Sequence, residues 1–257
     1  MLTSTKFQKL TQTIKNYRKQ FLDGKLADLD ESGTRIMINN FLSEVLGYKP
    51  LEEIKTEYMI KGTYADYVIQ INKTRHFLVE VKALSFDLSE KHLRQTINYG
   101  ANEGIEYALL TNGKSFEFYK IIFEQPISQR LIFSLDLSDL TKLKDNANYL
   151  QHLHRDSVVK NEFVPLWNKC EAFDSTNVAG IICSEPVLNA IKKLIKQKYN
   201  EKCDNDVILN SLQKIITEKM DLSLVKPFKL GKNKVARPKP IKNYPAQESA
   251  EPAITNE

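Results

Sequence analysis

Residues 64–83 contain two apolar, strand-like runs that each carry charge where a buried strand prefers an aliphatic side chain. Asp66 lies in the first run, Glu80 and Lys82 lie in the second, and the polar stretch 72–75 joins them. Burying an unpaired charge costs several kcal/mol. The chain can therefore bury these strands only in a fold that gives each charge a partner.

The spacing of these charges predicts where the partners lie. Successive side chains of a strand alternate between its faces, so Glu80 and Lys82 share one face near the end of their run. If the runs pair through the turn at 72–75, Asp66 approaches Glu80. Two close carboxylates repel, and one pKa rises, unless a cation lies between them. A divalent ion such as Mg²⁺ prefers oxygen ligands, and Lys82 beside it could hold a water or stabilise a phosphoryl oxygen.

A predicted helix at 31–46 adds a third acid to this set. Helical spacing places Glu31 on the stripe that also carries Ile38 and Leu42, and that stripe points inward. The alternative is that Glu31 is a first-turn acid that interacts with the helix dipole.

A second predicted helix, at 88–102, carries polar side chains on one face. Gln95 and Tyr99 are four residues apart and share that face, and Lys91 and His92 fall on the same side. An amide, a phenol, an ammonium and an imidazole suit a phosphate backbone or an ordered metal-bound water. This face is therefore a candidate contact surface for nucleic acid.

Helical periodicity alternates with strand-like runs along the first 155 residues. This order predicts a single α/β layer architecture, with a mixed sheet covered by helices and a small helical extension after it. Residues 106–120 are predicted as a hairpin, because Asn112-Gly113 is the strongest short turn signal. The predicted helices are 4–22, 31–46, 88–102, 138–155, 184–199 and 206–220. The other predicted strands are 55–60, 63–71, 76–83 and 130–137. Residues 156–183 show no clear hydrophobic period.

Positive charge gathers near the C-terminal end of the sequence. The chain has a net charge of +5, residues 226–243 hold seven Lys/Arg and no acid, and 244–257 hold three Glu and no base. The prolines of this segment predict an extended, disordered arm, which either binds a polyanion or solubilises the protein. We therefore expect a folded domain at 1–155, a mostly helical region at 156–225 and a tail at 226–257.

The chain shows no sign of a membrane or secretory segment. No apolar run approaches the roughly 18 residues that a membrane span needs, and the first residues are too polar for a signal peptide. The three cysteines, Cys170, Cys183 and Cys203, are widely spaced, which favours a reducing compartment. We expect a cytoplasmic protein with no membrane partner.

Three of these motifs together resemble a known family. Asp66, then Glu80-Val81-Lys82, then Gln95-Thr-Ile-Asn-Tyr99 resemble the PD-(D/E)xK nuclease superfamily with its QxxxY extension. With ESGTRIMINNFLSEVLGY and YALLTNG, the chain is similar over 25–140 to the N-terminal nuclease domain of type I restriction enzyme R subunits, especially its short, free-standing forms.

This resemblance implies a restriction-endonuclease-like fold and a metal-dependent activity. The fold would be a four-stranded mixed sheet flanked by helices, and the reaction would be phosphodiester hydrolysis with Mg²⁺ or Mn²⁺. Asp66 and Glu80 would be metal ligands, and Glu31 would be an outer ligand. Lys82 would be the catalytic lysine, and Gln95 would help to arrange the metal site.

The chain departs from the family pattern at two places. Ala65 stands where the first motif usually has proline, and we expect no counterpart in these residues of the helicase motor that follows the domain in R subunits. The Gly-Lys-Ser at 113–115 resembles the end of a phosphate-binding loop, but the motif needs Gly where this chain has Ala108. We therefore expect no ATP site.

Two main hypotheses follow. The first is a metal-dependent endonuclease that hydrolyses DNA phosphodiester bonds in restriction or phage defence. The alternative is a non-catalytic nucleic-acid-binding or assembly subunit that uses the same fold and the basic arm. A third, an RNA-directed nuclease, is not separated from the first by any residue pattern. Specific cutting of both strands would require a homodimer or a specificity or motor partner.

Overall fold

The computed structural model describes residues 1–24, 29–60 and 63–217. These residues divide into a first compact unit, Met1–Ser184, and a second that begins at Glu185. The predicted arm at 226–257 lies outside the described residues, as does the end of the predicted helix at 206–220.

Two N-terminal helices begin at polar caps and bury one stripe each. In α1 (Ser4–Phe21), Leu10, Ile14 and Tyr17 are buried at spacings of four and three residues. The helix α2 (Glu31–Asn40) begins where the Asp30 side chain accepts a hydrogen bond from the Gly33 amide at 2.7 Å, and it continues into the π-helix η1 (Phe41–Val45). Both predicted N-terminal helices are therefore present.

The sheet of the first unit has six strands in sequence order, β1-β2-β3-β4-β5-β6. Neighbouring strands are antiparallel except β3 and β4, which are parallel, so the sheet is mixed as predicted. The strands are β1 (Ile54–Ile60), β2 (Thr63–Ile71), β3 (Thr74–Val81), β4 (Tyr107–Thr111), β5 (Ser115–Ile122) and β6 (Ser128–Asp136).

The predicted α/β class is confirmed, but the count of four strands implied by the family resemblance is wrong for the described residues. Both ends of the sheet carry an extra strand: β1 continues the antiparallel pairing of β2, and β6 continues that of β5. The strand-like runs at 55–60 and 130–137 had already indicated these two strands. The residue pattern was therefore the better guide to the sheet.

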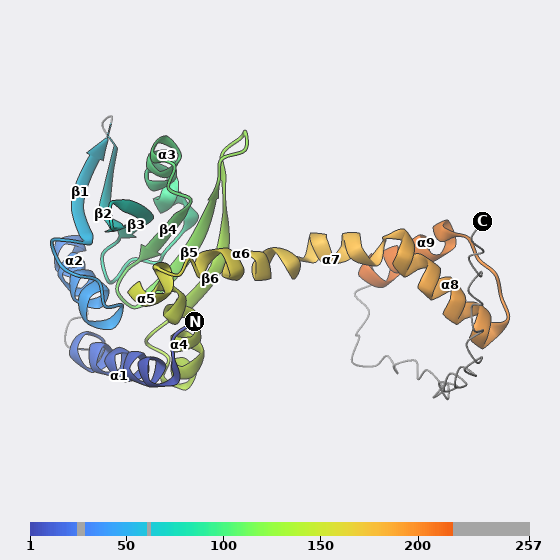
Figure 1. Cartoon of the computed structure of the whole chain (residues 1–257), viewed down its shortest axis with the longest axis horizontal. Helices are drawn as coiled ribbons and strands as arrows, with labels where there is room; N and C mark the ends of the chain where they lie inside the picture. The colour runs from blue at the N-terminus through green and yellow to red at the C-terminus, as the bar shows by residue number, and fades with distance from the viewer. Residues whose placement is uncertain (25–28, 61–62, 218–257) are drawn as a thin grey trace, which may run out of the picture. The chain divides into compact units, whose positions relative to one another are not determined.

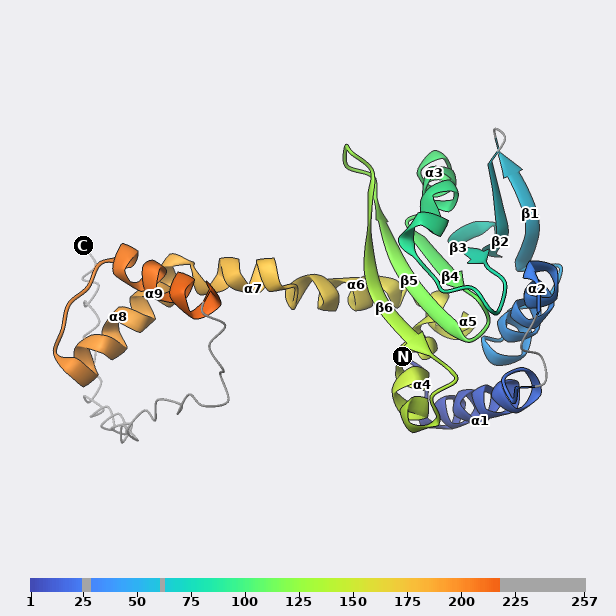
Figure 2. The same cartoon turned by 180° about the vertical axis from the view of Figure 1, so that it is seen from behind.

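Alternation along β3 divides the core into two layers. Phe77, Val79 and Val81 belong to one hydrophobic cluster, and Leu78 belongs to the other. The first cluster is filled by α1, α2, η1, α4 (Leu143–Leu153) and α6 (Phe163–Ala172), and the second by α3 (Arg94–Glu103) with the preceding 3₁₀ turn η2 (Glu90–Leu93). Figures 1 and 2 show α3 on one side of the sheet and α1 and α4 on the other.

The crossover helix α3 lies close to the sheet because it has no side chain at Gly100. A Cβ atom added there would be 2.6 Å from Ile121 Cδ1 and 2.8 Å from the Ile105 carbonyl oxygen. Both distances are shorter than real Cβ contacts, so even alanine would force a shift. Gly100 thus sets how near α3 approaches β5.

The predicted hairpin is formed by β4 and β5. The Asn112 side chain accepts hydrogen bonds from the amides of Lys114 and Ser115, and Gly113 has a φ of +87°. The Tyr17 hydroxyl of α1 donates to the Gly113 carbonyl at 2.8 Å. The Gly-Lys-Ser stretch is therefore part of a hairpin turn that α1 packs against.

The segment without clear periodicity is helical. It contains α5 (Arg155–Val158), α6 and α7 (Ser175–Ile182), and Phe163 and Leu166 of α6 are part of the core. We expected a division at residue 155, whereas the compact units divide after Ser184.

The second unit contains two helices among its described residues, α8 (Glu185–Tyr199) and α9 (Asn205–Thr217). They correspond to the predicted C-terminal helical extension. Among the helices described here, none combines the length and apolar character that a bilayer crossing requires.

Candidate active site

The charged residues of the two strand-like runs meet at one end of β2 and β3. Tyr67 pairs with Val79 in the register, which brings Asp66 beside the end of β3. One Asp66 oxygen, Oδ2, accepts a hydrogen bond from the Val81 amide at 2.7 Å. The Asp66 and Glu80 side chains are 8% and 10% exposed. The two carboxylates are therefore close together and nearly buried, as the alternation of the strands predicted.

Lys82 supplies the cation that Glu80 needs. Its Nζ donates to Glu80 Oε1 at 2.6 Å and lies 3.7 Å from Glu31 Oε2. The second Glu80 oxygen, Oε2, accepts a hydrogen bond from the fully buried Thr96 hydroxyl of α3 at 2.8 Å. Both oxygens of Glu80 are thus fixed, one by an ammonium and one by a hydroxyl.

Arg35 of α2 supplies the cation for Asp66. Its Nη2 lies 2.5 Å from Asp66 Oδ1 and 3.0 Å from Glu31 Oε1, one helical turn before it. The Tyr67 hydroxyl donates to the Arg35 carbonyl oxygen at 2.8 Å and so attaches α2 to β2. Glu31 therefore contacts the cluster from its rim, with its side chain 42% exposed, and it is also the first-turn acid of α2.

Burial and charge shift the pKa values of this cluster in opposite directions. Burial raises the pKa of Asp66 and of Glu80, against the hydrogen bonds and cations that lower them. Burial lowers the pKa of Lys82, but the hydrogen bond to Glu80 and the nearby carboxylates outweigh it, so the net shift is upward. The lysine therefore stays protonated, while the two carboxylates hold negative charge at a cost.

The carboxylate oxygens of the cluster suit a hard divalent cation, but in this structure they are paired with the side chains of Arg35 and Lys82. Glu31, Asp66 and Glu80 offer carboxylate oxygens, which are the ligands that Mg²⁺ prefers. Among the described residues, no group of three or more His, Cys, Asp or Glu is disposed as a metal site. Arg35 and Lys82 instead form ion pairs with Glu31, Asp66 and Glu80.

The predicted polar face of the helix at 88–102 is only partly formed. Lys91 is exposed, whereas Tyr99 is fully buried in the second core cluster, so the prediction that Tyr99 lies on a solvent-facing surface is wrong. The physical reason is that α3 buries a wide face against the sheet, because Thr96, Ile97, Tyr99 and Gly100 are all buried. The Gln95 side chain lies outside the described residues.

His92 has a structural contact at the start of this region. Its Nδ1 accepts a hydrogen bond from the Ser89 amide at 3.3 Å, and its ring packs against Phe86. His92 is still partly exposed, so the predicted role in nucleic-acid binding stays a prediction.

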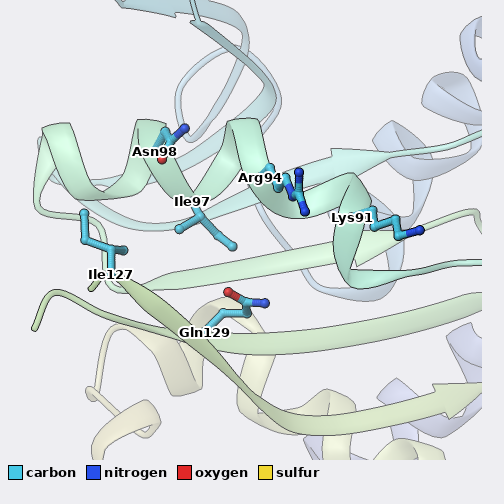
Figure 3. Close-up of a pocket in the computed structure, with 6 residues that line it drawn as sticks. All are labelled: Lys91, Arg94, Ile97, Asn98, Ile127 and Gln129. Atoms are coloured by element: carbon cyan, nitrogen blue, oxygen red, sulfur yellow. The ribbon is translucent and has the colours of Figure 1, made fainter. Parts of the chain in front are cut away.

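A groove lies beside α3 and carries two exposed cations (Figure 3). It has a volume of about 400 Å³. Lys91 and Arg94 line one side, and Gln129 at the start of β6 points toward them from the other side (Figure 3). Ile97, Asn98 and Ile127 complete the lining. Arg94 was not among the residues expected to contact nucleic acid.

Sequence reasoning missed Arg35 and Thr96 as members of the site. A signal for Arg35 was present, because it lies one turn after Glu31 on the inward stripe of α2. Thr96 lies three residues after the apolar residue Leu93, so helical spacing could have indicated a buried hydroxyl.

Comparison with known proteins matches this part of the chain. Residues 30–130 match the family model described as the type I restriction enzyme R protein N terminus. This segment is similar to that family. It contains the whole cluster of Glu31, Arg35, Asp66, Glu80 and Lys82, together with α3. The family resemblance predicted from the sequence is confirmed.

Solved structures and curated protein sequences were also compared with this chain. A type IIG restriction endonuclease, BpuSI, matches over 60% of this chain and 17% of its own chain, with 17% sequence identity and a TM-score of 0.26. A TM-score this low carries no argument about function. A comparison with curated protein sequences gives no significant match.

Proposed function

We propose that the protein is a metal-dependent nuclease that hydrolyses DNA phosphodiester bonds in a restriction or phage-defence system. The observation that carries the proposal is the meeting of Asp66, Glu80 and Lys82 at adjoining strand ends, within the segment of the restriction-enzyme family. Charges that are costly to bury are retained together here, which is typical of a functional site.

Each residue of the cluster has a role in this proposal. Asp66 and Glu80, with Glu31 at the rim, would hold a Mg²⁺ or Mn²⁺ ion, which would stabilise charge on a phosphoryl oxygen and lower the pKa of a bound water. Lys82 keeps its proton, so it would act as a cation that orients the water or stabilises the phosphoryl group. Thr96 holds the Glu80 carboxylate in one orientation. Gln95 remains a proposed catalytic residue of α3.

The groove beside α3 is the candidate contact for the DNA backbone. Lys91 and Arg94 are exposed and line the same surface (Figure 3). Ammonium and guanidinium groups bind phosphate oxygens and position a duplex without reading its sequence. We propose that specific cutting of both strands needs a second copy of this chain or a specificity or motor subunit.

Cleavage of supercoiled plasmid in Mg²⁺ or Mn²⁺ tests the proposal. We expect wild type to nick or linearise the plasmid and Lys82→Ala to be at least about 100-fold slower, because a cation is lost where charge develops. Lys120→Ala is the matched control, because Lys120 is also an ion-paired lysine but contacts Glu106 and Tyr107 away from the cluster. Equal cutting by wild type and Lys82→Ala would overturn the assignment of the site.

A non-catalytic nucleic-acid-binding or assembly subunit is the second candidate. The closed ion pairs favour it, because Arg35 and Lys82 already neutralise the carboxylates without a metal. This role predicts DNA binding that survives a chelator, together with no cutting by wild type. Running DNA and RNA substrates side by side separates both candidates from an RNA-directed nuclease.

A further inference from the structure

The Arg35 guanidinium occupies the cluster with incomplete hydrogen bonding. Its Nη2 contacts Asp66 Oδ1 at 2.5 Å and Glu31 Oε1 at 3.0 Å. Its Nε is buried and finds no hydrogen-bond partner among the described residues. A buried donor without a partner is costly. The attraction between Arg35 and the two carboxylates is therefore what holds the side chain there.

Every oxygen of the two buried carboxylates is already engaged. Asp66 uses Oδ1 for Arg35 and Oδ2 for the Val81 amide. Glu80 uses Oε1 for Lys82 and Oε2 for Thr96. Each oxygen keeps a second lone pair, but a divalent ion bound at Asp66 Oδ1 would lie beside the Arg35 guanidinium, and two cations so close repel each other. Arginine cannot give up its proton in proteins, so its side chain has to move.

We propose that Arg35 is a positioning residue that holds the Asp66 carboxylate in the place of a divalent cation, and that the cation displaces its guanidinium when it binds. The inference rests on the proposed metal-dependent function. The apparent metal affinity of the wild-type protein is then reduced by the fraction of time that the pair is open. Replacing Arg35 by a neutral side chain removes this competition.

A purely structural role for Arg35 predicts a different result. The Tyr67 hydroxyl attaches α2 to β2 through the Arg35 carbonyl oxygen, which every substitution keeps. If the side chain only supported the fold, its loss would leave metal affinity unchanged or weaken it. If it competes with the metal, its loss strengthens metal binding.

Isothermal titration of Mn²⁺ into the full chain distinguishes the two roles. We expect Arg35→Gln to bind Mn²⁺ at least about 10-fold more tightly than wild type, because a competing charge is removed. Arg35→Lys keeps the charge and should stay near wild type. Arg130→Gln, which removes an exposed arginine paired with Glu171, should not change the affinity. Adding Asp66→Asn to Arg35→Gln should abolish the gain.

A second measurement uses the wild-type protein and does not depend on the folding of a variant. The NMR resonance of the buried Arg35 Nε–H, identified by its loss in Arg35→Lys, should shift and exchange faster with water when Mg²⁺ is added. An unchanged resonance at saturating Mg²⁺, or a folded Arg35→Gln protein that binds Mn²⁺ no more tightly than wild type, would overturn the inference. The absence of Mn²⁺ binding in all variants would overturn it as well.

Plasmid cleavage separates this outcome from the proposed function. If wild type cuts DNA but Arg35→Gln gains no affinity, the competition by Arg35 is refuted and the nuclease stands. If Arg35→Gln gains affinity but no protein cuts, the competition stands and the nuclease is refuted.

Discussion

At the scale of single residues, the site is defined by which side chain neutralises which carboxylate. Lys82 and Arg35 provide two positive charges for the three carboxylates of Glu31, Asp66 and Glu80. The excess of negative charge is what makes the cluster attractive to a cation. Thr96 adds the only neutral side-chain donor found within this described cluster.

In the proposed nuclease, Thr96 should affect the cleavage rate without contacting the DNA. Thr96→Val removes the hydrogen bond to Glu80 while it conserves volume, so we expect a loss of about 10-fold in the cleavage rate, typical of groups that orient a ligand. Thr96→Ser keeps the hydroxyl and should restore most of the rate. If Thr96→Val cuts as fast as wild type, the hydrogen bond does not position Glu80.

The raised pKa of Glu80 predicts a pH-dependent stability. Burial raises this pKa above the unfolded value of about 4.3, so the folded protein binds the proton more tightly than the unfolded chain. At neutral pH the ionised Glu80 therefore lowers the free energy of unfolding. As pH falls through the folded pKa toward the unfolded value, this cost disappears. Glu80→Gln never bears it, so wild type should gain stability relative to Glu80→Gln on acidification. Urea unfolding at several pH values measures the difference, and parallel curves would contradict the assignment.

The residues that sequence could supply were those with a local signal. Asp66, Glu80 and Lys82 stood out because each is a charge in an apolar strand. Arg35 and Thr96 act across elements, and only the docking of α2 and α3 onto the sheet brings them to the carboxylates. Tyr99 was misplaced for the same reason, because only the docking of α3 shows how wide a face of the helix is buried against the sheet.

At the scale of elements, a second arginine fixes the segment that leads into β1. Arg155 of α5 makes two hydrogen bonds at 2.7 Å, from Nε to Glu53 Oε2 and from Nη2 to Glu53 Oε1. Its amide also donates to the Leu46 carbonyl, and Tyr48 donates to the Leu153 carbonyl at 2.6 Å. These contacts join the end of η1 to α4 and α5.

Loss of this ion pair should destabilise the first unit. Arg155→Met leaves Glu53 buried without its cation, so we expect the free energy of unfolding to fall by about 2–3 kcal/mol. The matched control is Arg130→Met, because the Arg130–Glu171 pair is 44% and 37% exposed, against 28% and 7% for Arg155–Glu53. The control should cost under about 1 kcal/mol. Equal losses in urea unfolding would contradict the role of burial.

The elements were predicted best where turn chemistry or periodicity was strong. The hairpin at Asn112-Gly113 and both N-terminal helices were found, because a positive-φ glycine and an apolar stripe are local signals. The bounds of the helices in 156–183 were not predicted, although 156–225 was expected to be mostly helical, because each helix is short and several apolar side chains, such as Phe173 and Ile181, are exposed. The position of α6 depends on the packing of Phe163 and Leu166 into the core, and α7 has no buried residue that would give it an apolar stripe.

At the scale of the whole molecule, charge is divided between a nearly neutral body and the basic segment at 226–243. The cluster of carboxylates and the groove at Lys91 both lie in the first unit. The basic segment lies outside the described residues, so its contribution is a prediction from sequence alone.

Deleting residues 226–257 tests that contribution. If the segment binds DNA, the deletion should weaken binding and should make the dependence of log affinity on log salt concentration shallower, by about 0.9 for each phosphate that is no longer neutralised. The variant Lys91→Ala/Arg94→Ala provides the comparison for the groove. Unchanged affinity and slope on deletion would identify the segment as a solubilising tail.

The lack of space for a side chain at Gly100 has a consequence for the carboxylate cluster. Gly100 lies one helical turn after Thr96, and the spacing between α3 and β5 depends on the absence of a methyl group there. A larger side chain would act as a wedge under the helix and would lift the Thr96 hydroxyl away from Glu80. The geometry of the carboxylate cluster thus depends on a residue that contacts none of its atoms. Any redesign of the site would have to keep glycine at position 100.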